Sequence, residues 1–260
     1  MKNYKTIIII AVVIICGLLL LPRAAKKTKN QLIVGMMSGW APFMSINGAG
    51  EYEGFDVDVA QEIAQRMNKN LVVQDLGSLA SCFVALEQQK IDMMMSDLDI
   101  TEKRRETFNM VRYAGNDVQT FDLIFWNNVP KNVRSMEDLK QFPDAVIGVE
   151  SGSAQERFVD SFPFIAKKRL NSLVDIVLDL RFGKSLAAVL EPRIAARLQK
   201  QNPELQRVSV ALPAEFQVFG CGIAIKKNNV SLARDIGRVV QDMIQDGTIK
   251  KLEQKWQLEE

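Results

Sequence analysis

The chain of 260 residues is 47% hydrophobic and 25% charged, which excludes a disordered or low-complexity protein. It contains no histidine, so the usual general base and the commonest transition-metal ligand are missing, and most hydrolase mechanisms are excluded. Residues 1–25 contain three of the 33 basic residues and none of the 31 acidic ones. Residues 26–260 therefore have 30 basic and 31 acidic residues, and this balance does not favour nucleic acid as a partner.

Residues 1–25 have the features of an export signal. Lys2 and Lys5 precede an apolar run from Ile7 to Leu21, whose 15 residues would reach about 23 Å as a helix. This length is short for a hydrocarbon core of about 30 Å and suits a signal sequence. Lipidation at Cys16, cleavage near residue 25 and an uncleaved anchor stay open. Each places the body of the chain in the periplasm or another extracytoplasmic space, with residues 26–30 as a polar tether.

The rest of the chain alternates strands with helices. Apolar runs predict strands at residues 31–35, 71–76, 91–96, 121–126, 145–149, 185–190, 208–212 and 219–225. Helical spacing of apolar residues predicts helices at residues 56–67, 78–89, 135–140, 153–160, 172–180, 193–200 and 231–256, the last interrupted at Gly247. This alternation predicts an α/β fold.

Cys82 and Cys221 lie beyond the signal and form an even pair. An oxidising compartment permits a disulfide between them, although their spacing does not imply one. Buried free thiols are the alternative, and both stay open.

Five stretches together resemble one known family. They are GWAPF from Gly39, EYEGFDVDVAQEIA from Glu51, KIDMMMSDLDITEKRRE from Lys90, GVESGSAQERF from Gly148 and SLAAVLEPRIAA from Ser185. In combination they resemble the periplasmic solute-binding proteins for polar amino acids, which are bacterial extracellular solute-binding family 3. The resemblance runs from residue 31 to the C-terminus and is closest to the arginine-binding, ArtJ-like members.

The resemblance implies a type II periplasmic-binding-protein fold with two α/β lobes, each with a mostly parallel five-stranded sheet. Lobe 1 is expected to comprise residues 31–116 and 217–260, and lobe 2 residues 121–212, with hinges near residues 115–120 and 213–218. The implied function is that of the receptor of an ABC importer, which closes on a basic amino acid, arginine foremost, and passes it to a membrane permease. We expect a monomer without cofactor, metal or catalytic residue.

Arg104 is the expected clamp for the ligand's carboxylate, because a guanidinium meets a carboxylate with two parallel hydrogen bonds. The strand predicted at residues 91–96 delivers it to a carboxyl edge of a sheet, where α/β domains bind ligands. From the other lobe, Ser153, Ala154 and Gln155 begin a helix whose free backbone N–H groups form an anion site. One carboxylate held from both lobes gives a physical reason for closure. Arg105 is expected to be a surface charge.

Acidic residues are expected to receive the ligand's positive charges. Glu191 stands where the family places an amine-binding acid, and Pro192 after it also makes it a helix cap. Asp97 and Asp99 stand where relatives often have small hydroxyl residues, and carboxylates crowded near Glu191 repel one another unless a cation arrives. We expect Asp99 to meet the amine and Asp97 the side-chain pocket, although outward orientation into water stays open for each.

Trp40 matches the family's aromatic residue that stacks on ligand side chains, and a tryptophan face attracts a guanidinium. Leu79 aligns with a second wall of the pocket, and Ser96 and Leu98 accompany the two aspartates. Further partners for a distal guanidinium are Glu51 and Glu150, while packing roles are expected for Phe43 and Phe55.

Three other functions stay open. The chain could serve another polar amino acid such as glutamine, and the order of arginine, lysine and ornithine is undecided. An exported dehydratase of the same fold would use Arg104 as a clamp and Glu191 as a proton donor. A surface interaction protein that has lost its ligand is the third.

Overall fold

The computed structural model describes residues 30–258, and its helices and strands belong, apart from the first residue of β1, to the unit that begins at Leu32. The predicted signal, Cys16 and the predicted tether up to residue 29 lie outside the described residues. None of the helices between residues 30 and 258 has the length and apolar character needed to cross a bilayer.

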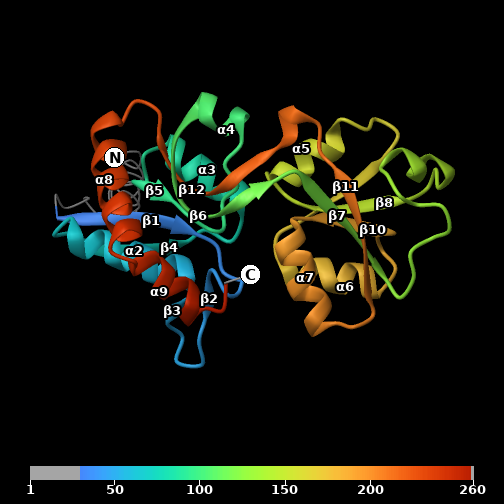
Figure 1. Ribbon diagram of the computed structural model, residues 1–260, viewed down its shortest axis with the longest axis horizontal. Helices are drawn as coiled ribbons and strands as arrows, with labels where there is room; N and C mark the ends of the chain where they lie inside the picture. Colours follow the sequence, from blue (N-terminus) through green and yellow to red (C-terminus); the bar gives the residue numbers. More distant parts are fainter. Residues whose placement is uncertain (1–29, 259–260) are drawn as a thin grey trace, which may run out of the picture. The chain divides into compact units, whose positions relative to one another are not determined.

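Two five-stranded sheets organise these residues (Figure 1). The first sheet contains, from edge to edge, β4 (Asn70–Asp75), β1 (Gln31–Met36), β5 (Met93–Met94), β12 (Val218–Lys226) and β6 (Phe108–Val118). The second contains β11 (Leu205–Ala211), β7 (Thr120–Trp126), β10 (Ala187–Leu190), β8 (Val146–Glu150) and β9 (Ala166–Leu170). A short hairpin of β2 (Ser45–Ile46) and β3 (Tyr52–Glu53) lies apart from both.

Each sheet contains a strand that runs against its neighbours. β12 is antiparallel to β5 and β6, whereas β1 and β5 are parallel. β7 is antiparallel to β10 and β11, whereas β8 is parallel to β9 and β10. The predicted two-lobed α/β fold is confirmed, with sheets that are mixed in their pairing.

The chain passes between the sheets twice. β6 ends at Val118 and β7 begins at Thr120, and the return runs through a single 3-10 turn, η2 (Ala214–Phe216), between β11 and β12. The amide of Leu212 donates to the carbonyl of Gln119 at 2.9 Å, so the two crossings are joined. We propose that these two crossings are the hinges. In this proposal each lobe consists of one sheet and the helices that cover it, with the bounds predicted from the sequence.

Helices cover both sheets (Figure 1). With the first sheet lie α2 (Phe55–Arg66), α3 (Leu79–Glu87), α4 (Glu102–Thr107), α8 (Val230–Gln245) and α9 (Thr248–Lys255). The second has α5 (Ala154–Asp160) on one face and α6 (Leu173–Arg181) and α7 (Pro192–Gln201) on the other, with a 3-10 helix, η1 (Glu137–Gln141). Side chains cap five of these helices, as helix-start chemistry predicts, at Ser78, Thr101, Ser153, Ser172 and Asn229.

In the two large sheets, three strands differ from the sequence-based expectation, and the short strands β2 and β3 were not predicted either. β6 and β9 are absent from the expectation, and both are edge strands in which polar residues interrupt the apolar pattern. β5 is confined to Met93–Met94 because the chain turns at Asp97, whose φ is +50°. After that turn, residues 98–100 run along β12, where the amide of Gly222 donates to the carbonyl of Leu98. This path brings Asp99 to the space between the sheets.

The two cysteines of the described chain, Cys82 and Cys221, are buried and free. The structure therefore has two buried thiols rather than a disulfide.

Gly54 fixes the loop that carries Trp40 and Phe43. Its φ is +141°, and an added Cβ would lie 2.1 Å from the carbonyl oxygen of Phe43. We expect Gly54→Ala to lower the free energy of unfolding by about 2 kcal/mol, measured by urea denaturation. Gly48→Ala is the matched control, since an added Cβ there meets nothing within 4 Å, and it should change stability by less than about 0.5 kcal/mol. Equal losses in both variants would contradict this account of Gly54.

Candidate functional site

A small cavity lies where the carboxyl ends of strands from both sheets face each other. Its volume is about 30 Å³, which is room for about two water molecules and too little for an amino acid. Trp40 comes from the loop after β1, Asp97 and Asp99 from the segment after β5, and Glu191 follows β10. The complete lining is Trp40, Asp97, Asp99, Glu150, Gln155, Leu190, Glu191 and Ile194. Six of the twelve residues expected in the site therefore meet around one cavity.

Four of these residues carry carboxylates, and burial makes ionisation costly for Asp99, Glu150 and Glu191. Desolvation raises the pKa of Glu191 to about 8, and the charges of Asp97 and Asp99 add to this while Arg193 opposes it. Desolvation likewise raises the pKa of Asp99 to about 6, against the attraction of Arg104. Burial raises the pKa of Glu150 well above its usual value. A cation entering the cavity would favour the ionised form of all three groups.

Arg104 joins the two sides of the site through backbone carbonyls. Its Nη1 donates to the carbonyl of Asp99 at 2.6 Å, and its Nη2 donates to the carbonyl of Gly152 at 3.1 Å. The guanidinium also lies 5.3 Å from the centre of the Phe83 ring. Arg104 does not line the small cavity. It borders a neighbouring hollow of about 410 Å³, together with Ser153 and Ala154.

The start of α5 is less open to an anion than the sequence predicts. Ser153 is the N-cap and its hydroxyl accepts from the amide of Glu156 at 2.9 Å. The carboxylate of Glu156 in turn accepts from the amide of Gly152 at 2.7 Å, and the amide of Ser151 donates to the carbonyl of Leu170 at 3.0 Å. The amide of Gly152 is not free because an acid in the first turn folds back onto it, and the expectation of a free amide is wrong at Ser153 as well, whose amide donates to the carbonyl of Glu150 at 3.2 Å. Gln155 instead reaches across the site, where its Nε2 donates to Asp99 at 3.2 Å.

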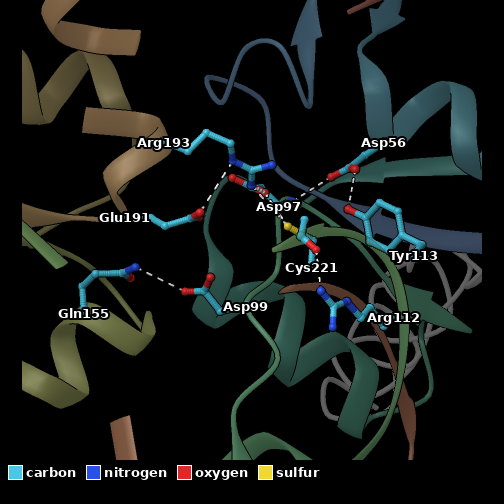
Figure 2. A network of polar contacts seen from close by, with 10 residues as sticks. Asp56, Asp97, Asp99, Arg112, Tyr113, Gln155, Glu191, Arg193 and Cys221 are labelled. Carbon is cyan, nitrogen blue, oxygen red and sulfur yellow. Dashed lines mark hydrogen bonds and ion pairs between the residues drawn. The ribbon is translucent and has the colours of Figure 1, made fainter. Parts of the chain in front are cut away.

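Arg193 is a site residue that the sequence reasoning missed. It lies in the first turn of α7, and its Nη2 donates to Oδ1 of Asp97 at 2.7 Å and to Sγ of Cys221 at 3.3 Å (Figure 2). Its guanidinium lies 5.2 Å from the centre of the Phe43 ring, and its Nε is 3.6 Å from Glu191. The sequence feature that could have indicated it is its position two residues after Glu191, a predicted ligand acid.

Asp97 is held from three sides. Besides Arg193, the thiol of Cys221 donates to its Oδ1 at 3.0 Å (Figure 2). Its amide donates at 2.7 Å to Asp56, a fully buried acid that also accepts from the hydroxyl of Tyr113 at 2.5 Å. Burial raises the pKa of Asp56 to about 7. A carboxylate oxygen and the amide of Asp97 are thus both bound within the protein.

Three buried polar side-chain atoms among residues 30–258 have no hydrogen-bond partner. They are Nε1 of Trp40, Oε1 of Glu150 and Nε of Arg193. Buried polar groups almost always find a partner, so orphaned groups need an explanation. Trp40 and Glu150 line the cavity and Arg193 adjoins it through Glu191. One orphaned acceptor and two orphaned donors at one place are what a polar ligand would satisfy.

Comparison with known proteins assigns the family. The model for bacterial extracellular solute-binding proteins, family 3, matches residues 32–259. The chain belongs to this family. The probable ABC transporter arginine-binding protein ArtJ of Chlamydia trachomatis is 30% identical to this family 3 protein, over 92% of this chain and 90% of that one.

Solved structures have the same fold. A mutant of ArgBP from T. maritima superimposes with a TM-score of 0.77 at 26% identity, covering 89% of this chain and 96% of that chain. The ancestral amino acid-binding protein AncCDT-1, described as a precursor of cyclohexadienyl dehydratase, has a TM-score of 0.74 at 25% identity, with 88% and 96% covered.

The remaining predicted residues of this family 3 protein lie outside the cavity lining. Leu79 and Leu98 are buried in the hydrophobic core, and the hydroxyl of Ser96 donates to the carbonyl of Met37 at 3.4 Å. Glu51 is exposed in the β2–β3 hairpin. Phe43 packs edge-to-face on Phe55 with ring centres 6.3 Å apart, as expected for packing residues. Arg105 is exposed and pairs with Glu102, as expected for a surface charge.

Proposed function

We propose that this family 3 protein is the extracytoplasmic receptor of an ABC importer and binds a basic amino acid, arginine foremost. The acidic cavity carries the proposal. Four carboxylates line it, and the guanidiniums of Arg104 and Arg193 are the basic groups in contact with them or with their backbone. The acids of the cavity therefore outnumber these basic groups. Arginine has two cationic groups and one carboxylate, so its binding reduces the excess of negative charge. The arginine-binding relative supports the same ligand class.

The residues of the site suggest which group of the protein binds each group of the ligand. Arg104 receives its carboxylate after releasing the carbonyl of Gly152, and Asp99 and Glu191 receive the ammonium group. Glu150, with its orphaned oxygen, receives the distal guanidinium beside Trp40. Since the cavity of about 30 Å³ is too small for this ligand, the lobes part for entry and then close around the ligand with a wider cavity between them.

The affinity required is feasible. Arginine has about 12 non-hydrogen atoms, and micromolar binding needs about 8 kcal/mol, well below the ceiling of about 1.5 kcal/mol per atom. Several charge-assisted hydrogen bonds of about 1.5–3 kcal/mol each would supply it.

Isothermal titration of ligand-stripped protein from residue 26 onward tests the ligand class. We expect arginine to bind more tightly than lysine, ornithine, histidine, glutamine and glutamate. Asp99→Asn should weaken arginine binding about tenfold, because a buried charge partner is lost. Asp235→Asn is the control, since that acid is exposed on α8 and does not line the cavity. Tightest binding of glutamine would contradict the basic-ligand class, and silence across the panel would contradict the receptor function.

A dehydratase activity is the second candidate. It is favoured by the raised pKa of Glu191, which keeps a proton available near neutral pH, and by the similarity to a dehydratase precursor. Incubation with a cyclic carboxylic acid such as prephenate, followed by absorbance of the aromatic product, tests it. Absence of turnover in the protein that binds arginine would reject it.

The family places the protein's work outside the cytoplasm, and we propose that the segment before residue 30 exports it. Lipidation at Cys16, tested by labelling with a fatty-acid analogue and lost in Cys16→Ser, would tether it to a membrane. The loaded receptor would act as a monomer and pass its ligand to an ABC permease, and deletion should abolish arginine uptake.

A further inference from the structure

The proposed binding mode gives Arg193 no contact with the ligand, so the role of this side chain in the site is still to be assigned. It extends from α7, beside the second sheet, to Asp97 in the segment that follows β5 of the first sheet (Figure 2). Its side chain is 20% exposed and that of Asp97 is 5% exposed, so solvent does little to screen the pair. The face of Phe43, 5.2 Å away, stabilises the guanidinium further.

This contact places a guanidinium of the protein next to the cavity proposed for a ligand guanidinium. Oδ1 of Asp97 accepts from both Arg193 and the thiol of Cys221. The positive φ of Asp97 and the bond from its amide to Asp56 hold the residue in this orientation. Asp99 differs, because its carboxylate accepts from the neutral amide of Gln155, while the nearby guanidinium of Arg104 donates to its backbone carbonyl. The two aspartates of the SDLD segment are therefore in different electrostatic states.

We propose that Arg193 is a specificity-determining residue that neutralises Asp97 from within the chain. The ligand's positive charges then meet Asp99, Glu150 and Glu191, and Asp97 contributes little to their attraction. This inference rests on the proposed function, because it concerns how strongly the same cavity prefers a cationic ligand. It also changes the expected role of Asp97, which serves as the partner of Arg193 rather than as the wall of the side-chain pocket.

Loss of Arg193 would remove the positive charge that neutralises Asp97. Asp97 lines the cavity, so without its partner it would present an uncompensated carboxylate to the ligand. An additional negative charge a few ångströms from the ligand's guanidinium attracts that group strongly at the effective dielectric constant of a protein site. Ligands of the same shape without the charge gain nothing from it.

Arginine and citrulline form the matched ligand pair, because citrulline replaces the guanidinium with a neutral urea of nearly equal size. The measured quantity is the ratio of the Kd for citrulline to the Kd for arginine, obtained by titration calorimetry. We expect Arg193→Gln to raise this ratio about tenfold. Arg193→Lys keeps the charge and should leave the ratio near the parent value. The double variant Arg193→Gln/Asp97→Asn should return it most of the way to that value, the remainder being due to Glu191, which also loses Arg193 as its neighbour at 3.6 Å.

Asp97→Asn tests the inference independently if Arg193→Gln does not fold. It leaves Arg193 without its acid, so the ratio should fall about tenfold. An unchanged ratio in folded Arg193→Gln would overturn the inference and assign the pair to stability alone. A lower ratio in that variant would also overturn it, because Arg193 would then support Asp97 as a ligand acid. Failure of the parent protein to bind either compound would overturn the proposed function and with it this inference.

Discussion

Replacing Arg104 with alanine is expected to weaken arginine binding at least about a hundredfold. The buried guanidinium is the group proposed to meet the ligand's carboxylate with two parallel charge-assisted hydrogen bonds. Two such bonds at about 1.5–3 kcal/mol each correspond to a loss between about a hundredfold and ten-thousandfold. The same substitution removes the bond to the carbonyl of Asp99, so the segment that carries this ligand acid is held less firmly as well. Titration calorimetry measures the change in Kd.

Arg105→Ala is the matched control on the same helix. Its side chain is 44% exposed and pairs with Glu102, so its removal should change the Kd less than about twofold. Arg104→Lys should give an intermediate loss, because the charge stays but the planar fork is lost. Thermal unfolding of each variant shows whether it is folded. An Arg104→Ala variant that is folded and binds arginine normally would mean that the carboxylate is received elsewhere.

The elements that could be predicted from the sequence are those whose burial follows a simple period. In α2 the apolar residues recur at helical spacing, and its buried positions match that pattern. The strand β9 could not be predicted in this way, because its sequence AKKRL carries charges. It pairs with β8 alone and forms an edge, where lysine and arginine limit pairing with other chains. Local polarity therefore concealed a strand that tertiary pairing creates.

In the site, too, contacts that form only in the folded chain could not be predicted, and these contacts include the partners of its charged groups. Asp99 and Glu191 were predicted from the family resemblance, and each lies just beyond the end of a strand in the structure. The partner of Asp97 could not be predicted, since Arg193 is 96 positions away and its own neighbours indicate only the first turn of a helix. The bond from the amide of Ser151 to Leu170 could not be predicted because Leu170 lies on another strand, whereas the spacing of Ser153 and Glu156 is that of a capping box and indicates that Glu156 folds back. Contacts between segments distant in sequence decide which predicted ligand groups are free.

Binding of arginine is expected to weaken about a hundredfold as the pH falls from 8 to 6. In the ligand-free protein burial raises the pKa of Glu191 to about 8 and that of Asp99 to about 6, in surroundings that also contain Asp97, Glu150, Arg104 and Arg193. The cationic ligand favours the carboxylate forms, so these groups must lose protons on binding. While one group titrates, the affinity changes about tenfold per pH unit. Titrations near pH 7 in buffers of different ionisation enthalpy should show at least about one proton released, from Glu191 and from Glu150, whose pKa burial also raises.

The stability of the ligand-free protein should have the opposite dependence on pH. A carboxyl whose pKa is raised on folding contributes stability that is complete below its usual pKa, near 4.5 for Glu191, and lost as the pH rises through about 8. The melting temperature should therefore fall between pH 5 and 8 without ligand, and saturating arginine should reduce this fall. Glu191→Gln should reduce the slope of both profiles between pH 6 and 8, because the amide does not titrate, while the raised pKa values of Asp56 and Glu150 leave part of the slope of the stability profile in place. A Kd that is constant from pH 6 to 8 in the parent protein would show that Glu191 does not meet the ligand's positive charge.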